Sequence, residues 1–70
     1  MDANKLEMLI FEFVKNRTME TESITSRHIH RRFDIEMTQA EEILINLSDQ
    51  KLIEKFYDEE YQEDRYNLKK

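Results

Sequence analysis

The chain contains neither glycine nor proline in 70 residues, although average usage would give several of each. Glycine normally supplies left-handed backbone conformations, and proline normally fixes turns. Turns in this chain therefore have to be made by residues such as Asn, Asp, Ser and Lys. Any position with a positive φ must carry a side chain, at some cost in strain. The same absence excludes the Gly-rich loops with which nucleotide-binding proteins hold phosphate.

Apolar and charged residues each make up 39% of the chain, which is enough for one small core with little apolar surface to spare. The absence of cysteine excludes disulfides and the usual structural zinc sites. The longest apolar run, Met8 to Phe11, has four residues, whereas a membrane-spanning helix needs about 20. The N-terminus does not have the pattern of a signal peptide. We therefore expect a cytoplasmic protein without a cofactor.

Charge is distributed unevenly along the chain. Residues 1–33 hold six bases against five acids, a net charge of +1, and residues 34–70 hold five bases against eleven acids, a net charge of −6. Nucleic-acid-binding domains usually carry a basic patch. The second half of this chain is expected to repel phosphate.

The spacing of apolar residues predicts three helices. The first covers about residues 3–16, with Leu6, Leu9, Ile10, Phe13 and Val14 on its core face. The second covers about 26–33 after Thr25 as N-cap, and the third about 38–50 with Thr38 as N-cap. Met8 and Phe11 lie about 140–200° from Leu6 at the helical rotation of about 100° per residue. They are either covered by neighbouring chain or form a partner-binding or homodimer face.

The apolar period changes from 3.6 to 2 after Leu52, which predicts a β-hairpin over about residues 53–68. Ile24 is a candidate for a very short third strand. We expect the aromatic residues of the hairpin to cover its inner face and to strengthen cross-strand pairs. These residues are Phe56, Tyr57, Tyr61 and Tyr66. The predicted fold is mainly α with a small β-hairpin, organised as one domain over residues 1–70.

Residues 24–53 resemble the winged helix-turn-helix domain of MarR-like transcriptional regulators of bacteria, archaea and phages. The match lies in apolar spacing: Ile24–Thr25 for an opening Leu-Thr, then Ile29, Phe33, Ile35, Ala40, Leu44 and Leu47, and Leu52–Ile53 for a closing Leu-Ile. The resemblance implies a winged helix with residues 53–68 as its wing, and binding to duplex DNA. Such spacing is better evidence for fold than for function.

Three positions depart from the family pattern. Asp34 and Lys51 replace two glycines of the family. Asp tolerates a left-handed conformation better than most residues do, whereas Lys implies strain or a changed turn. His30 stands where a small residue is usual. At the edge of the helix contact it is either a satisfied polar group, which we expect, or a local pH-sensitive spot.

In a helix-turn-helix the third helix enters the major groove and its outward residues contact base edges. Gln39 and Asn46 can pair with adenine, and Glu42 can accept a hydrogen bond from cytosine. None of these side chains neutralises a phosphate, and the expected wing, "YDEEYQED", carries five acids and no base. The candidate DNA-binding residues are Thr25, Ser26, Arg27, Arg31, Arg32, Thr38, Gln39, Glu42 and Asn46.

Positive charge is concentrated in "SRHIHRRF", residues 26–33. Arg27 and Arg31 are spaced i, i+4, as are His28 and Arg32, so like charges lie next to each other on the helix surface. Each such pair costs roughly a few tenths of a kcal/mol unless nearby acids form ion pairs with it. Three interpretations stay open. The arginines form ion pairs within the chain, or they contact phosphate, or they form a groove for an acidic partner protein.

Two function hypotheses follow. The first is a small DNA-binding regulator, and the second is an acidic protein-interaction module, such as an adaptor, an inhibitor or a nucleic-acid mimic, that does not bind DNA. The candidate partner-binding residues are Met8, Phe11, Tyr57, Asp58, Glu59, Glu60 and Tyr61. The partners are therefore duplex DNA or a basic protein, with a homodimer as a further option. We expect no enzyme, because no nucleophile–base arrangement stands out and His28 and His30 lie about 200° apart on a helix, which is poor geometry for a metal.

Overall fold

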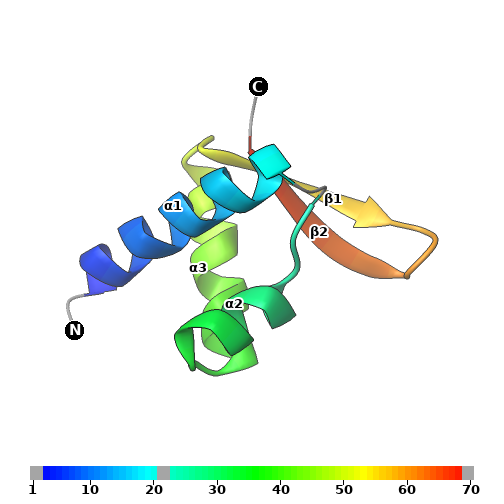
Figure 1. Ribbon diagram of the computed structural model, residues 1–70. Helices are drawn as coiled ribbons and strands as arrows, with labels where there is room; N and C mark the ends of the chain where they lie inside the picture. The colour runs from blue at the N-terminus through cyan, green and yellow to red at the C-terminus, as the bar shows by residue number, and fades with distance from the viewer. Residues whose placement is uncertain (1–2, 21–22, 69–70) are drawn as a thin grey trace.

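The computed structural model describes residues 3–20 and 23–68 of the chain. Three helices are followed by an antiparallel hairpin: α1 (Ala3–Glu20), α2 (Ser26–Phe33), α3 (Met37–Asp49), β1 (Ile53–Asp58) and β2 (Glu63–Leu68). Figure 1 shows the helices packed against one another and the hairpin projecting from them on one side. The predicted mainly α fold with a small hairpin is confirmed, and its layout is that of a winged helix with the hairpin as the wing.

The core lies where the three helices meet the base of the hairpin. Its buried residues come from every element and from the segment between α1 and α2: Ile10, Val14, Ile24, Ile29, Ala40, Leu44, Leu47, Ile53 and Tyr66. Burial of one large aliphatic side chain contributes about 1.5–3 kcal/mol. Because each helix alone buries only a few residues, the helices are held by their contacts with one another rather than by local preference.

Helix α1 continues to Glu20, so the predicted end near residue 16 was wrong. The segment "NRTME" looked like a turn because it is polar. It contains no glycine or proline to end the helix, however. The hydroxyl of Thr18 donates to the carbonyl oxygen of Val14 at 2.8 Å, which satisfies this polar group without leaving the helix.

The buried face of α1 is rotated relative to the prediction. Ile10 and Val14 are fully buried, whereas Leu9 is 41% exposed and does not belong to the core. Phe11 was predicted to lie off the core face, yet it packs partly against the core. The reason is that the face is centred on Ile10 and Val14 rather than on Leu6, and at about 100° per residue this brings Phe11 to one edge of the face.

Helix α3 begins at Met37, with Glu36 as its N-cap. The prediction that Thr38 caps this helix was therefore wrong. The backbone N–H of Ala40 donates to the carbonyl oxygen of Glu36 at 2.9 Å, and this first helical hydrogen bond places Thr38 inside the first turn. Helix α2 has the predicted bounds, and its N-cap is Thr25 as predicted.

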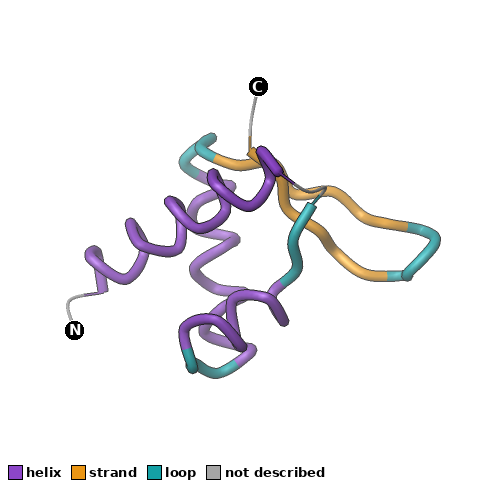
Figure 2. Tube along the Cα trace, viewed as in Figure 1, coloured by secondary structure: helices purple, strands orange, loops and turns teal. Residues whose placement is uncertain are grey.

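The hairpin joins the helices through Ile24. Backbone groups of Ile24 and Tyr66 exchange two hydrogen bonds, of 2.9 and 2.8 Å, so the predicted third strand is a single bridge. The expectation that all hairpin aromatics cover the inner face was wrong. Tyr66 is buried, but Phe56, Tyr57 and Tyr61 are exposed, because the outer part of the hairpin extends past the helices (Figure 2).

Three residues other than glycine have a positive φ among the described residues: Asp34 (55°), Lys51 (66°) and Gln62 (53°). Asp34 and Lys51 are the two positions where the resembled family has glycine. Lys51 follows α3 in a Schellman arrangement, in which its N–H donates to Ser48 at 3.0 Å and the N–H of Leu52 donates to Leu47 at 3.1 Å. Of the two alternatives for Lys51, the turn has not changed, and Lys51 carries the strain of a left-handed conformation.

Replacing Lys51 by glycine is expected to stabilise the protein. A left-handed conformation costs a residue with a Cβ about 1–2 kcal/mol, and part of this is regained because glycine also has more entropy to lose on folding. We expect a gain of about 0.5–1 kcal/mol in the free energy of unfolding, measured by urea denaturation. Lys51→Ala is the matched control, because it removes the same charge and keeps the strain. An equal gain in the alanine variant would assign the effect to charge.

Candidate nucleic-acid interface

An open groove of about 500 Å³ separates the start of α2 and the outer side of α3 from the hairpin. We call it the wing groove. Its lining contains two bases, three acids and five uncharged residues: Arg27 and Lys55, Glu41, Glu63 and Asp64, and Thr25, Ser26, Met37, Ile45 and Tyr66. The formal charge of the lining is therefore −1. The groove has the position of a winged-helix DNA interface without the usual positive charge.

Helix α3 lines this groove with Met37, Glu41 and Ile45. The residues predicted to contact bases, Thr38, Gln39, Glu42 and Asn46, are all exposed but do not line the groove. The opposite face of α3 holds the core residues Ala40, Leu44 and Leu47. The helical spacing thus predicted correctly which side of α3 is available to a partner.

Arg27 is paired within the chain. Its guanidinium lies 3.1 Å from a carboxylate oxygen of Glu63 on the hairpin. For Arg27 this agrees with the interpretation that the arginines of α2 form ion pairs with acids of the same chain. The Arg27 side chain is nevertheless 57% exposed, and ion pairs with this exposure contribute roughly 0–1 kcal/mol. A phosphate can therefore replace Glu63 as its partner at low cost.

Arg65 is a second cation at the hairpin, and the sequence analysis did not single it out. It lies 2.8 Å from Glu63 and 3.9 Å from Asp58, and it donates to the backbone carbonyl of Ser23 at 3.0 Å. It also stands over the ring of Tyr61, with 5.8 Å to the centroid. These contacts fix the hairpin to the segment before α2. The place of Arg65 directly after Glu63 and Asp64 was the only signal for them in the sequence.

The candidates at the start of α2 are not equivalent. Thr25 is only 3% exposed, and its hydroxyl lies 3.1 Å from Nδ1 of His28. It therefore supports the start of the helix and offers little to a ligand. Ser26 is half-buried in the lining of the groove. Ser26 and Arg27 are thus the residues of α2 that a ligand in the wing groove meets.

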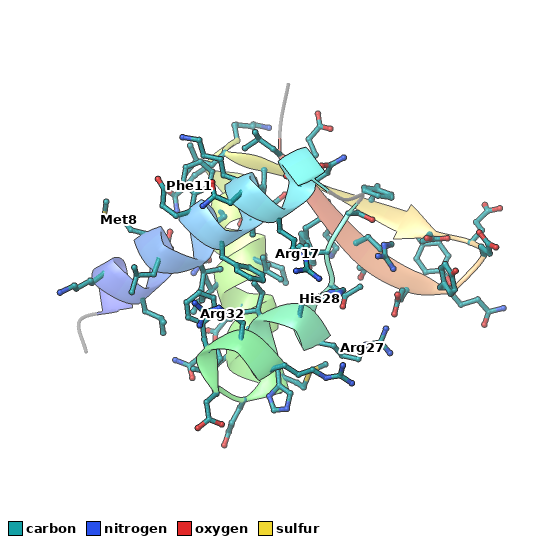
Figure 3. All side chains as sticks on the ribbon, in the orientation of Figure 1. Met8, Phe11, Arg17, Arg27, His28 and Arg32 are labelled. Carbon is teal, nitrogen blue, oxygen red and sulfur yellow. The ribbon has the colours of Figure 1, made fainter. Side chains whose placement is uncertain are left out.

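Arg31 and Arg32 do not face the wing groove. They line a separate hollow of about 320 Å³ between α1 and α2, together with Phe13, Arg17 and His28. Figure 3 shows Arg17 extending from α1 toward the start of α2, where His28 lies. Arg17 was not among the predicted site residues, because the predicted helix ended at residue 16. In a longer helix Arg17 follows Phe13 by one turn, which places both on the side of α2.

His28 and His30 serve different local structures. The backbone N–H of Thr25 donates to Nδ1 of His28 at 3.0 Å, so the neutral ring carries its proton on Nε2. Burial lowers the pKa of His28, and the charges of Arg17, Arg65, Arg27 and Arg31 lower it further. His30 donates from Nδ1 to the carbonyl oxygen of Ile35, so the expectation that it is a satisfied polar group is confirmed.

The tip of the hairpin is acidic and exposed. Asp58 accepts hydrogen bonds from the backbone N–H groups of Glu60 at 2.9 Å and Tyr61 at 3.3 Å, so its carboxylate forms the turn. Glu59 and Glu60 are exposed, and Tyr57 and Tyr61 are 58% and 65% exposed. The predicted partner-binding residues of the hairpin are thus brought together, with the carboxylate of Asp58 engaged in the turn.

Met8 and Phe11 lie far from the hairpin tip, on the other side of the helices (Figure 3). They line a shallow hollow of about 260 Å³ with Glu7, Leu47, Gln50 and Leu52. Met8 is 69% exposed and Leu52 is 38% exposed. This apolar patch is therefore separate from both the wing groove and the hollow between α1 and α2.

No protein-family model, curated protein sequence or solved structure matches this chain. In the part of the chain that the structure describes, no helix is long and apolar enough to cross a membrane. Over the same residues, no group of three or more His, Asp or Glu side chains is placed to hold a metal ion. The surfaces that bear on function are therefore the wing groove, the basic hollow between α1 and α2, the acidic hairpin tip and the apolar patch around Met8.

The stability of the protein is expected to fall as the pH drops below about 6.5. The pKa of His28 is lower in the folded chain than its ordinary value of 6.5, so the unfolded chain binds the proton more readily. The stability from neutral His28 is present above that value and is lost as the pH falls through the lower folded pKa. Protonation also removes the acceptor for the Thr25 N–H.

Urea denaturation at about pH 7.5 and about pH 5.5 measures this dependence. His28→Gln keeps an acceptor at the capping position without titrating, and we expect it to show a smaller loss of stability between the two pH values. His30→Gln is the matched control and should retain the wild-type loss. The same loss in His28→Gln as in the wild type would contradict the assignment.

Proposed function

We propose that this protein is a small winged-helix DNA-binding protein that acts as a transcriptional regulator. The outward side of α3 supports the proposal, because it is exposed and carries Gln39 and Asn46, while Glu41 and Ile45 of the same helix line the wing groove. Amide side chains of this kind pair with adenine in the major groove. The apolar spacing that resembles MarR-like regulators agrees with this function but does not carry it.

The charge of the interface limits the binding strength. Ser26 and Arg27 would contact the backbone, while Glu63 and Asp64 in the same groove would repel it. Most non-specific affinity for DNA comes from neutralised phosphates. We therefore propose weak, strongly salt-dependent binding by one copy, and a homodimer through the apolar patch around Met8 that doubles the phosphate contacts.

Two variants of the ion pair between α2 and the hairpin are expected to change DNA binding in opposite directions. Arg27→Gln removes a phosphate contact, so affinity should fall and the salt slope should decrease by about 1. Glu63→Gln removes a repulsive charge and frees Arg27, so affinity should rise several-fold. The measurement is fluorescence anisotropy with a random-sequence duplex pool at about 0.02 and 0.15 M salt.

Glu12→Gln is the matched control for Glu63→Gln, since it removes one exposed acid from α1 and should leave DNA binding as it is in the wild type. In the same titration Met8→Glu tests the homodimer, because a monomer would neutralise half as many phosphates and show about half the salt slope. Absence of any salt-sensitive binding by the wild type at low salt would overturn the proposed function.

The hairpin tip favours a second candidate function, an acidic protein-interaction module. Glu59, Glu60, Tyr57 and Tyr61 are exposed on a projecting hairpin. Tyrosine is enriched in protein interfaces, and carboxylates complement a basic partner. Such a surface can occupy the binding site of a nucleic-acid-binding protein.

Reversal of charge at the tip separates the two functions. Glu59→Lys with Glu60→Lys should strengthen DNA binding if the first function holds, and should abolish capture of a basic protein partner if the second holds. Both residues are exposed, so folding should be retained and can be checked by circular dichroism. Pull-down from a lysate with wild type and variant in parallel is the measurement, and an unchanged set of captured proteins would exclude the tip as the binding surface.

A further inference from the structure

The hollow between α1 and α2 gathers positive charge in a chain of net charge −5. Its lining consists of three arginines, one histidine and one phenylalanine: Arg17, Arg31, Arg32, His28 and Phe13. We call it the arginine cleft. Among the residues that the structure describes, no acid lines it, whereas the wing groove has three acids in its lining. The two surfaces on either side of α2 therefore have opposite electrostatic character.

The arginines near the hairpin differ in their pairing from the two arginines that α2 contributes to the cleft. Arg27 and Arg65 are both paired with carboxylates. Over residues 3–20 and 23–68, neither Arg31 nor Arg32 forms an ion pair. Like charges held close together on a helix repel one another. An anion bound between them would relieve this repulsion.

Aromatic contacts hold the cleft in shape. The guanidinium of Arg32 lies over the ring of Phe33 at 5.5 Å from its centroid. Phe33 meets Phe13 edge to face, with 5.7 Å between centroids and 85° between ring planes. This pair fixes α1 against α2, and the stacked guanidinium loses less freedom on binding than a free one.

His28 adds a neutral donor to the cleft. Its Nδ1 accepts the backbone N–H of Thr25, which leaves Nε2–H to donate. The pKa of His28 is lowered by burial and by the charges of Arg17, Arg65 on the hairpin, and Arg27 and Arg31 on α2. The positive potential of the arginines thus reaches this ring directly.

From this arrangement we propose that the arginine cleft binds a phosphate group. The guanidinium groups of Arg31 and Arg32 and the imidazole N–H of His28 offer more donors, from more directions, than the two oxygens of a carboxylate accept. A phosphate monoester has three terminal oxygens and a charge of −1.5 to −2 at neutral pH. The group belongs either to a small phosphorylated molecule or to the backbone of a nucleic acid.

Inorganic phosphate is the first probe, and the two histidines are the reporters. NMR titrations of the ring protons of His28 and His30 are recorded in phosphate and in chloride at equal ionic strength. The pKa of His28 should be higher in phosphate, because a bound anion offsets the neighbouring arginines, while His30, which does not line the cleft, serves as the control. Equal titration of His28 in both salts would overturn the proposal.

The variant Arg31→Gln with Arg32→Gln should abolish the response of His28 to phosphate. Lys5→Gln with Lys15→Gln removes the same charge from exposed positions of α1 outside the cleft and should retain it. Equal loss in both variants would mean that net charge, not the cleft, is responsible, and would also overturn the proposal. Arg31→Gln alone serves if loss of the Arg32 contact with Phe33 unfolds the double variant, and it should weaken the response.

A DNA titration then distinguishes the two sources of phosphate. If the cleft holds backbone phosphates, Arg31→Gln with Arg32→Gln should lower the salt slope of duplex binding by about 2. If the slope is unchanged while the phosphate response is lost, the ligand is a small phosphorylated molecule. The phosphate arm contains no DNA, so failure of the proposed DNA-binding function leaves this test intact.

Discussion

Two backbone hydrogen bonds between Ile24 and Tyr66 determine how the wing lies on the helices. Ile24 belongs to the short segment between α1 and α2, and Tyr66 belongs to the last strand. The bridge therefore joins two segments that are separated by more than half of the chain. Both side chains are buried in the same core. Because the bridge is surrounded by apolar groups, its backbone N–H and carbonyl groups would have no water to replace it if it opened. The position of the hairpin beside α3 depends on this bridge.

Polar contacts also hold the hairpin in the position that the bridge between Ile24 and Tyr66 gives it. Arg65 joins the strand to Ser23, next to Ile24, and Arg27 joins Glu63 to the start of α2. These contacts use the cations nearest the wing to hold the acidic hairpin. The wing groove is left with more acids than bases, while the arginines farther along α2 face α1. The division of charge between the two sides of α2 is thus a consequence of how the wing is attached.

A winged helix with an acidic wing has a shape suited to the major groove and a charge opposed to it. The fold concerns the packing of apolar side chains and does not determine what the exposed face binds. Affinity for DNA depends on the number of phosphates neutralised, and the lining of the wing groove offers two bases against three acids. Under the proposed function, binding therefore depends on few exposed side chains, and single charge changes have large relative effects.

Apolar spacing alone predicted the three helices, the hairpin, the bounds of α2 and the outward face of α3, since helical and strand periods decide which side chains can share a core. Asp34 and Lys51 were also identified as positions of special backbone conformation. The spacing did not determine where α1 ends, because a polar segment can continue a helix when nothing in it stops one. Nor did it place Phe11 or the hairpin aromatics, because their burial depends on which neighbours reach them.

The charged sites were decided by the tertiary structure. The sequence grouped Arg27, Arg31 and Arg32 into one basic segment, and the fold divides them between the wing groove and the cleft that Arg17 completes. Glu63 is 36 residues from Arg27 in the chain but 3.1 Å away in space. Charge acts over distances of several ångströms regardless of sequence separation. Local periodicity therefore determined the elements of this protein, and only their packing determined which charges meet.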